Sequence, residues 1–269
     1  MEDINRDAKI ELQLAAARAV LAATGKSPRQ IGEESRLEVI RWIYRWGYSS
    51  ATSIQQLLGR TAAGYAQKLA CQGWLQAINT ESGTPKCYFT LSELGMQEAE
   101  RHTEVLLRYQ EIDPYRVNQK LIRHNLIAQH ATINAMHSNL AVDYLTERML
   151  NQAGNKPGEK IPDVTWITMS GLRVGVEVEL TAKWERDLHQ FVLGVIQALN
   201  SKNDKPAKYD RFAVITDSPA IKKRYSDAFQ PGAALPIWQK DNRQHWVIEK
   251  TAKAPDWVIT KIDFHLFGS

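Results

Sequence analysis

The 269-residue sequence has few cysteines, no long uncharged apolar run and little net charge. Its two cysteines, Cys71 and Cys87, lack the spacing of a metal-binding motif, which argues against a disulfide scaffold and a cysteine-rich zinc site. Two free thiols suit a reducing compartment, so a cytoplasmic location is expected. The longest Ala/Leu-rich stretch, residues 12–23, contains Arg18 and is too short to span a bilayer, which predicts no membrane insertion.

The net charge of +4 is too small to demand a nucleic-acid partner, because solubility alone explains mild basicity. The sequence shows neither an internal repeat nor a low-complexity tract. With 43% hydrophobic and 24% charged residues, it has the composition of a folded globular protein. The length permits one large domain or two ordinary ones, so the order of the elements has to decide the organisation.

The first part of the chain has the element order of a winged helix-turn-helix. Helical spacing of apolar residues and flanking glycines predict helices, and two β-prone runs around a Gly/Pro loop predict a hairpin. A polar helix follows, and Asp113-Pro114 breaks the pattern. The expected segments are helices at 5–24, 36–46, 51–58 and 62–72, with Thr61 capping the last, hairpin strands at 74–78 and 87–91, and a helix at 92–110.

The second part alternates helices and strands, so the fold class is expected to be α+β or α/β. The expected segments are a long helix at 118–151, strands at 163–168 and 172–181, a helix at 183–201, a strand at 211–216, a helix up to residue 229, and strands at 235–239 and 245–250. The expected domains are an N-terminal helix and loop at 1–33, a winged helix-turn-helix at 34–112 and an α/β domain at 113–269.

The segment TAAGYAQKLACQGWL is expected to hold the recognition helix. If Ala62, Ala66 and Leu69 face the core, the polar and aromatic side chains between them project outward toward phosphates and base edges. The alternative is a surface that binds protein, because winged helices also serve as docking modules. The candidate DNA-binding residues are Arg60, Thr61, Tyr65, Lys68 and Gln72 in this segment, and Thr84 and Lys86 on the hairpin loop.

Three carboxylates are predicted to meet on the later hairpin. Glu177 and Glu179 share a strand face, because residues two apart point the same way. A three-residue loop at 169–171 would place Asp163 opposite Glu177. Such a patch repels itself unless a cation neutralises it, and oxygen-only ligands favour Mg²⁺ or Mn²⁺. Lys183, which follows, can reach the patch and stabilise negative charge.

Each of these residues also has an ordinary explanation. Two glutamates on one strand face usually form a solvated surface, and Pro-Asp recurs at Pro255-Asp256 without such a strand behind it. His124 is a candidate general acid, general base or further ligand, and equally a surface or helix-capping histidine. The sequence therefore predicts a metal site of Asp163, Glu177 and Glu179, with Lys183 and His124 as further catalytic candidates.

Pro162-Asp163, Glu177 and the helix that follows resemble the PD-(D/E)xK, restriction-endonuclease-like family. The usual lysine position holds Glu179 here, and Lys183 resembles a lysine that has migrated to the next helix. Together with the winged helix, HNLIAQ (124–129) and EVELTAK (177–183) make residues 34–250 similar to MobC-type plasmid mobilisation relaxases and replication-relaxation proteins.

The resemblance implies a metal-dependent relaxase that nicks double-stranded plasmid DNA at a transfer origin. It also implies relaxosome accessory proteins and a coupling protein as partners. The alternative is a non-catalytic DNA-binding regulator or replication accessory protein with a degenerate nuclease fold. A third hypothesis is a host-defence restriction subunit, which would cut both strands of many DNAs.

Overall fold

The computed structural model describes residues 11, 14–15, 18–19, 21–152, 160–201 and 206–268. The chain forms two compact units, one of Met1–Asn79 with Gly83–Pro114 and one of Thr80–Ser82 with Tyr115–Ser269. Both contain helices and sheets, so the expected mixture of α and β structure is confirmed. Among the described residues, no helix combines the length and apolar character needed to cross a bilayer.

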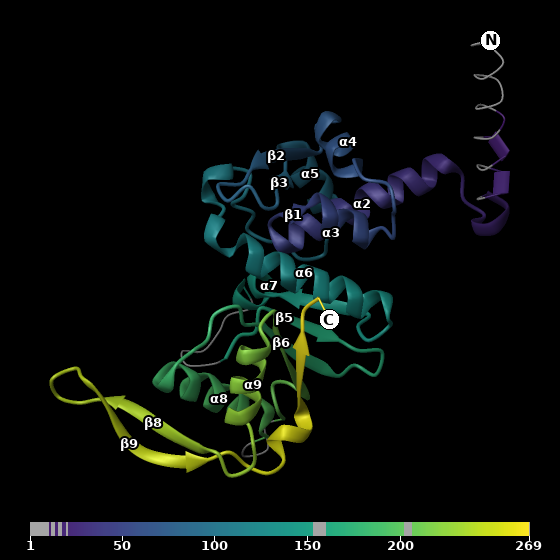
Figure 1. Ribbon diagram of the computed structural model, residues 1–269. Coiled ribbons are helices and arrows are strands. Elements are labelled where there is room, and N and C mark those ends of the chain that lie inside the picture. The colour runs from purple at the N-terminus through teal and green to yellow at the C-terminus, as the bar shows by residue number, and fades with distance from the viewer. Residues whose placement is uncertain are drawn as a thin grey trace. The chain divides into compact units, whose positions relative to one another are not determined.

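The first unit packs helices around a small antiparallel sheet (Figure 1). Strand order in this sheet is β1-β3-β2, and the two long strands form the predicted hairpin. The core contains fully buried Ile40, Ile43, Ile54, Tyr88 and Leu91. The elements are α2 (Pro28–Trp46), β1 (Ser49–Ser50), α3 (Ala51–Leu57), α4 (Tyr65–Cys71), β2 (Leu75–Asn79), β3 (Cys87–Leu91) and α5 (Glu93–Arg101).

Several predicted boundaries in this unit are wrong. Helix α2 begins at Pro28 instead of residue 36, because Ser27 and Gln30 form a capping box that starts the helix inside the expected loop. Helix α4 begins only at Tyr65, and its N-cap is Gly64 at φ 99° instead of Thr61. Helix α5 ends at Arg101, well before residue 110. The helix predicted at 5–24 falls largely outside the described residues.

The second unit contains a five-stranded sheet of order β10-β7-β6-β5-β4. Strands β10, β7 and β6 pair in parallel, whereas β6, β5 and β4 pair antiparallel. A separate ribbon, β8–β9, extends away from this sheet (Figure 1). The elements are η1 (Pro114–Arg116) at the boundary, η2 (Gln119–Leu121), α6 (Ile122–His137), β4 (Asp143–Thr146), α7 (Glu147–Gln152), β5 (Val164–Ile167), β6 (Arg173–Val178), α8 (Glu185–Leu199), β7 (Arg211–Thr216), α9 (Pro219–Ala228), β8 (Ala234–Lys240), β9 (Trp246–Lys253), η3 (Val258–Lys261) and β10 (Ile262–Leu266).

Helices cover both faces of the five-stranded sheet (Figure 1). On one face, the Trp166 indole N–H donates a 3.0 Å hydrogen bond to Thr132 of α6. On the other, Phe212 and Val214 pack into a cluster with residues of α8 and α9. Because side chains alternate along a strand, Gly175 and Glu177, which pair with Phe212 and Val214, lie on the α8 face.

The prediction of one long helix at 118–151 is wrong. Helix α6 ends at His137, and Asn139 adopts a left-handed conformation at φ 58° that turns the chain. The chain continues as β4, in which Tyr144 is 3% exposed, and as the short helix α7. Strand β10 was not predicted, and helix α8 begins at Glu185 instead of residue 183.

Gly175→Ala is expected to lower the free energy of unfolding of the second unit by about 1–3 kcal/mol. A Cβ at this position would lie 2.5 Å from Cε2 of Phe212, whose fully buried ring has no room to move. Chemical denaturation measures the loss. The control is Gly194→Ala in α8, where the new Cβ meets Lys160 at an ordinary 3.6 Å and the helix gains about 0.5–1 kcal/mol. Equal stabilities of the two variants would contradict this account.

Candidate functional site

The hairpin of β5 and β6 has the register that the sequence predicted. Val164 pairs with Val176, and the Thr168 N–H donates a 3.0 Å hydrogen bond to the Leu172 carbonyl, which closes the three-residue loop 169–171. The same register places Asp163, just before β5, opposite Glu177. An Asp163 carboxylate oxygen accepts a 2.7 Å hydrogen bond from the Val178 N–H, so the aspartate is fixed at the end of both strands.

The carboxylates do not form a solvated face. Glu177 and Glu179 are each only 5% exposed, so the alternative that they belong to a solvated strand surface is wrong. Together with Asp163 they line a cleft of about 780 Å³, and His124 from α6 and Lys183, ahead of α8, line the same cleft. The structure thus brings the five predicted catalytic candidates to one place.

Each of these three carboxylates lies beside a cationic side chain. The Lys160 ammonium is 2.5 Å from Oε1 of Glu177, and Lys183 forms an ion pair with Glu179. Both ammonium groups lie 5.0 Å from the centroid of the Phe191 ring, so the two pairs flank one aromatic side chain. Nε2 of His124 lies 3.3 Å from the Asp163 carboxylate. Three acids and three potential cations therefore make up a carboxylate cluster.

Burial and mutual repulsion shift the protonation of the carboxylate cluster. Burial first, and then the negative charge of Asp163, raise the pKa of Glu177 to about 8, although Lys160 opposes the shift. Burial alone would lower the pKa of His124, but the hydrogen bond to Asp163 and its charge outweigh burial and raise that pKa to about 9. At neutral pH the imidazole is therefore protonated, and Glu177 is largely neutral.

The hydrogen bonds of His124 limit its role. Nε2 lies 2.9 Å from the Val178 carbonyl oxygen, and because a carbonyl only accepts, Nε2 carries a hydrogen. Nδ1 lies 3.1 Å from the Asn125 side-chain oxygen. A protonated ring held in this way cannot act as a general base. The geometry favours a cation that positions Asp163 and the end of β6.

The donor set of the carboxylate cluster fits a hard divalent cation. Its acids supply oxygen ligands, which Mg²⁺ and Mn²⁺ prefer. Burial and then the negative charge of Asp163 raise the pKa of Glu177, and a bound divalent ion would offset both by favouring the ionised carboxylate. In the side-chain arrangement of the described residues, no three His, Cys, Asp or Glu groups converge as a finished metal site.

Sequence reasoning missed two residues of this cluster. Lys160 stands in an irregular segment three residues before Asp163, where no periodicity points to a side chain. Tyr225 lies on α9, and its fully buried hydroxyl has a raised pKa because of burial and the nearby negative charge of Glu179. The packing of α9 on the sheet brings Tyr225 to the hairpin, whereas Lys160 arrives there on the segment that leads into β5.

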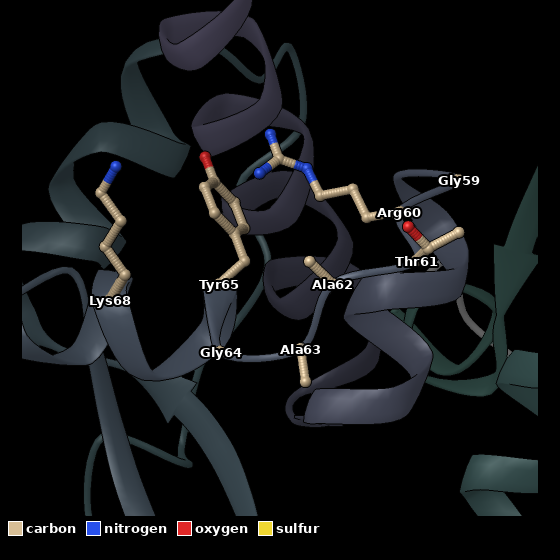
Figure 2. A pocket seen from close by; sticks show the side chains of 8 residues that line it. All are labelled: Gly59, Arg60, Thr61, Ala62, Ala63, Gly64, Tyr65 and Lys68. Carbon is tan, nitrogen blue, oxygen red and sulfur yellow. The ribbon is translucent and has the colours of Figure 1, made fainter. Parts of the chain in front are cut away.

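Four of the predicted DNA-binding residues line a pocket of about 580 Å³ between α3 and α4: Arg60, Thr61, Tyr65 and Lys68 (Figure 2). The Arg60 guanidinium lies 3.9 Å from the centroid of the Tyr65 ring and donates a 3.1 Å hydrogen bond to Ser35. The Tyr65 hydroxyl donates to the Gly32 carbonyl at 3.4 Å. Arg60 and Tyr65 are thus tied to α2, and Tyr65 is half-buried instead of projecting freely.

The other predicted contacts of this unit divide between core and surface. Ala66 and Leu69 are buried as expected, but Ala62 is exposed, because it precedes α4. The exposed candidates are Thr61, Lys68, Gln72, Thr84 and Lys86.

A neighbouring cleft of about 420 Å³ adds two arginines that the sequence analysis did not select. Arg29 and Arg36 of α2 line it together with Arg60 and Lys68. Glu33 is the one acidic residue among its lining side chains and is ion-paired with Arg29 at 3.0 Å. The excess of positive charge suits a phosphate backbone.

Comparisons with known proteins identify no family for either unit. No protein-family model, no curated protein and no solved structure matches the chain. The function of the two clefts therefore has to be inferred from their own residues.

Glu177→Gln is expected to stabilise the protein in metal-free buffer, increasingly so as the pH rises. The folded state raises the pKa of this carboxyl from 4.5 to about 8, so ionisation is disfavoured and the stability contribution of Glu177 falls across this range. The amide carries no such penalty. The melting temperature of the variant should exceed that of the wild type by about 2–4 °C for each kcal/mol relieved, more at pH 8.5 than at pH 6.

Thermal unfolding in EDTA at several pH values measures the effect of Glu177→Gln. The control is Glu147→Gln, which removes an exposed carboxylate lining the same cleft. An advantage of Glu177→Gln that shrinks as the pH rises would show that the buried carboxyl is not the source.

Proposed function

We propose that this protein is a metal-dependent DNA endonuclease that nicks one strand of plasmid DNA. The observation that carries the proposal is the carboxylate cluster, in which buried Glu177 and Glu179 meet Asp163 at the end of a hairpin and in an open cleft. Burying acids beside one another is costly, and such clusters are typical of functional sites instead of stable cores. The order of hairpin, helix and parallel strand around them supports a PD-(D/E)xK nuclease fold.

The first unit is proposed to be a winged helix-turn-helix that selects the DNA site. Its support is the order α2, β1, α3, α4 and a β2–β3 hairpin, with a basic surface beside α4. Lys68 and Gln72 are exposed on or just after α4, as side chains that contact DNA have to be. Arg29 and Arg36 extend the phosphate-binding surface beyond the residues predicted from the sequence.

The residues of the carboxylate cluster divide the chemical work. Asp163, Glu177 and Glu179 would hold Mg²⁺ or Mn²⁺, and the bound ion would polarise a phosphodiester and activate water. Lys183, half-exposed at the cleft, is placed to stabilise negative charge that develops on the phosphate. Lys160 favours the ionised form of Glu177, and protonated His124 fixes Asp163 by its charge.

The biological setting of the proposal comes from the sequence resemblance. MobC-type relaxases act at a plasmid transfer origin, so double-stranded DNA at such an origin is the proposed substrate. Relaxosome accessory proteins and a coupling protein are the proposed partners. A relaxase has to leave one strand intact, which separates this proposal from a restriction subunit that cuts both.

A non-catalytic DNA-binding regulator is the second candidate. The observation in its favour is that Lys160 and Lys183 already pair with Glu177 and Glu179, as in a nuclease fold that no longer needs a metal. Both candidates bind DNA, so binding does not distinguish them. Cleavage that depends on a divalent cation does.

Asp163→Asn is expected to abolish nicking and leave DNA binding nearly unchanged, and Lys183→Ala is expected to slow nicking by about 10²–10³-fold. Asp163 would be a metal ligand, whereas Lys183 would act mainly on developing charge. Single-turnover nicking of supercoiled plasmid carrying its transfer origin, with Mg²⁺ or Mn²⁺ and with EDTA, measures both. Products are mapped on each strand.

The control for these variants is Asp227→Asn, which removes an exposed carboxylate of an ion pair on α9. Nicking by Asp163→Asn at the control rate would exclude the carboxylate cluster as the active site. No cation-dependent nicking by the wild type would favour the regulator, and early linear product would refute strand selectivity.

Lys68→Ala is expected to weaken DNA binding on all sequences and to reduce the slope of log K against log salt by about one unit. The exposed ammonium lines both basic pockets of the first unit, as a phosphate contact would. Fluorescence anisotropy with duplex DNA at several salt concentrations measures the slope. Lys223→Ala on α9 is the matched control, and an unchanged slope in Lys68→Ala would move the phosphate contact to another surface.

A further inference from the structure

Two exposed tryptophans lie beside the first turn of α8, each stacked with cations. Trp184, immediately before the helix, is 66% exposed, and the Arg224 guanidinium lies 3.9 Å from its ring centroid. Trp246 of β9 is 41% exposed, and Arg186 of α8 lies 4.7 Å from its ring centroid. Lys240 of β8 lies 5.6 Å from the same ring. Large aromatic side chains left in water next to cations indicate a surface for a ligand.

Trp184, the tryptophan next to the carboxylate cluster, is linked to the backbone at Lys183 through Arg224. Trp184 follows Lys183 directly and lines the same cleft as Asp163 and Glu177. The Arg224 guanidinium stacked on it donates a 2.9 Å hydrogen bond to the Lys183 carbonyl. Any chain that stacks on Trp184 therefore passes beside the ion pair of Lys183 and Glu179.

The second tryptophan is held by the β8–β9 ribbon. Trp238 of β8 donates a 3.3 Å hydrogen bond to His189, which anchors the ribbon on α8. Trp246 pairs with Lys240 near the tip of the ribbon, so ring and ammonium lie on adjacent strands. Arg186 also forms a 2.8 Å ion pair with Asp187, which lines the cleft. The first turn of α8 thus connects the two tryptophans.

The chemistry of these pairs fits an unpaired nucleic-acid strand. Exposed aromatic rings provide faces on which separated bases stack, and interspersed Arg and Lys side chains attract the phosphates between them. A duplex keeps its base faces covered by neighbouring bases and cannot use the rings in this way. A protein partner is the alternative occupant, because Trp and Arg are also common at protein interfaces, and the test below distinguishes the two.

We infer that Trp184 and Trp246, with Arg224, Arg186 and Lys240, form a track that binds a single DNA strand beside the carboxylate cluster. The inference rests on the proposed function in one respect, since it assigns the bound strand as the one to be cut. It goes further by stating that the DNA is melted where it enters the cleft. The first unit would hold the duplex, and the track would hold the separated strand.

The test compares single-stranded and duplex oligonucleotides of the same sequence, using full-length protein in EDTA and fluorescence anisotropy. Trp184→Ala and Trp246→Ala should each weaken single-strand binding by about 5- to 100-fold, because one stacked base is lost. Duplex affinity should change less than twofold. Trp184→Phe should recover most of the single-strand affinity, since a ring remains.

The matched control is Trp257→Phe. Trp257 also has a lysine, Lys261, 5.4 Å from its ring, but it packs against the core of the second unit. Unchanged single-strand affinity in both alanine variants would overturn the track, as would an equal loss on duplex DNA. A wild-type protein that does not bind single strands would overturn it too and point to a protein partner.

Failure of the track and failure of the proposed function give different results. If the tryptophan variants bind single strands normally and the wild type nicks DNA, only the inference of a single-strand track is refuted. If the wild type binds single strands through the tryptophans but never nicks DNA, only the proposed nuclease activity is refuted.

Discussion

The structure of the second unit depends on how three buried or half-buried acids are kept together. Glu177 and Glu179 are almost completely buried, and Asp163 lies opposite Glu177 at the start of the other strand of the hairpin. Their repulsion is reduced by two lysine ion pairs, by a protonated histidine and by partial protonation of Glu177. These cations come from a loop, from the segment just before α8 and from α6. Replacing the acids with apolar side chains would make a simpler core, so keeping the three acids together costs stability.

The sheet gives this cluster its position. The tight loop after β5 fixes the hairpin register, and Gly175 lets Phe212 lie against β6, which brings α8 close to the acids. One face of β6 carries valines toward α6, and the other carries the glutamates toward α8 and α9. Shifting this register by one residue would turn both glutamates toward α6. The same register thus supports both the packing of the sheet and the proposed site.

The surfaces of the two units differ in chemistry, as the two forms of DNA proposed to bind them would require. In the first unit, Arg29, Arg60 and Lys68 line adjoining pockets with few acids, an arrangement suited to a continuous phosphate backbone. In the second, stacked tryptophans and arginines beside an acidic cleft are suited to separated bases and to a metal ion. Under the proposed function, selecting a duplex and cutting one of its strands would take place in two different chemical environments.

The sequence by itself determined the features that depend on local pattern. Strand parity and loop length correctly placed Asp163 opposite Glu177, and the Gly/Pro loop correctly predicted the β2–β3 hairpin. Helical periodicity was misleading at 118–151, because Asn139 turns the chain and Tyr144 is a buried residue of strand β4 instead of a helix. Only the tertiary structure decided that the glutamates are buried, that Lys160 and Tyr225 join them, and that His124 is a cation. The reason is physical: α6, α8 and α9 bury the acids across long sequence separations, and no local pattern records which side chains they bring together.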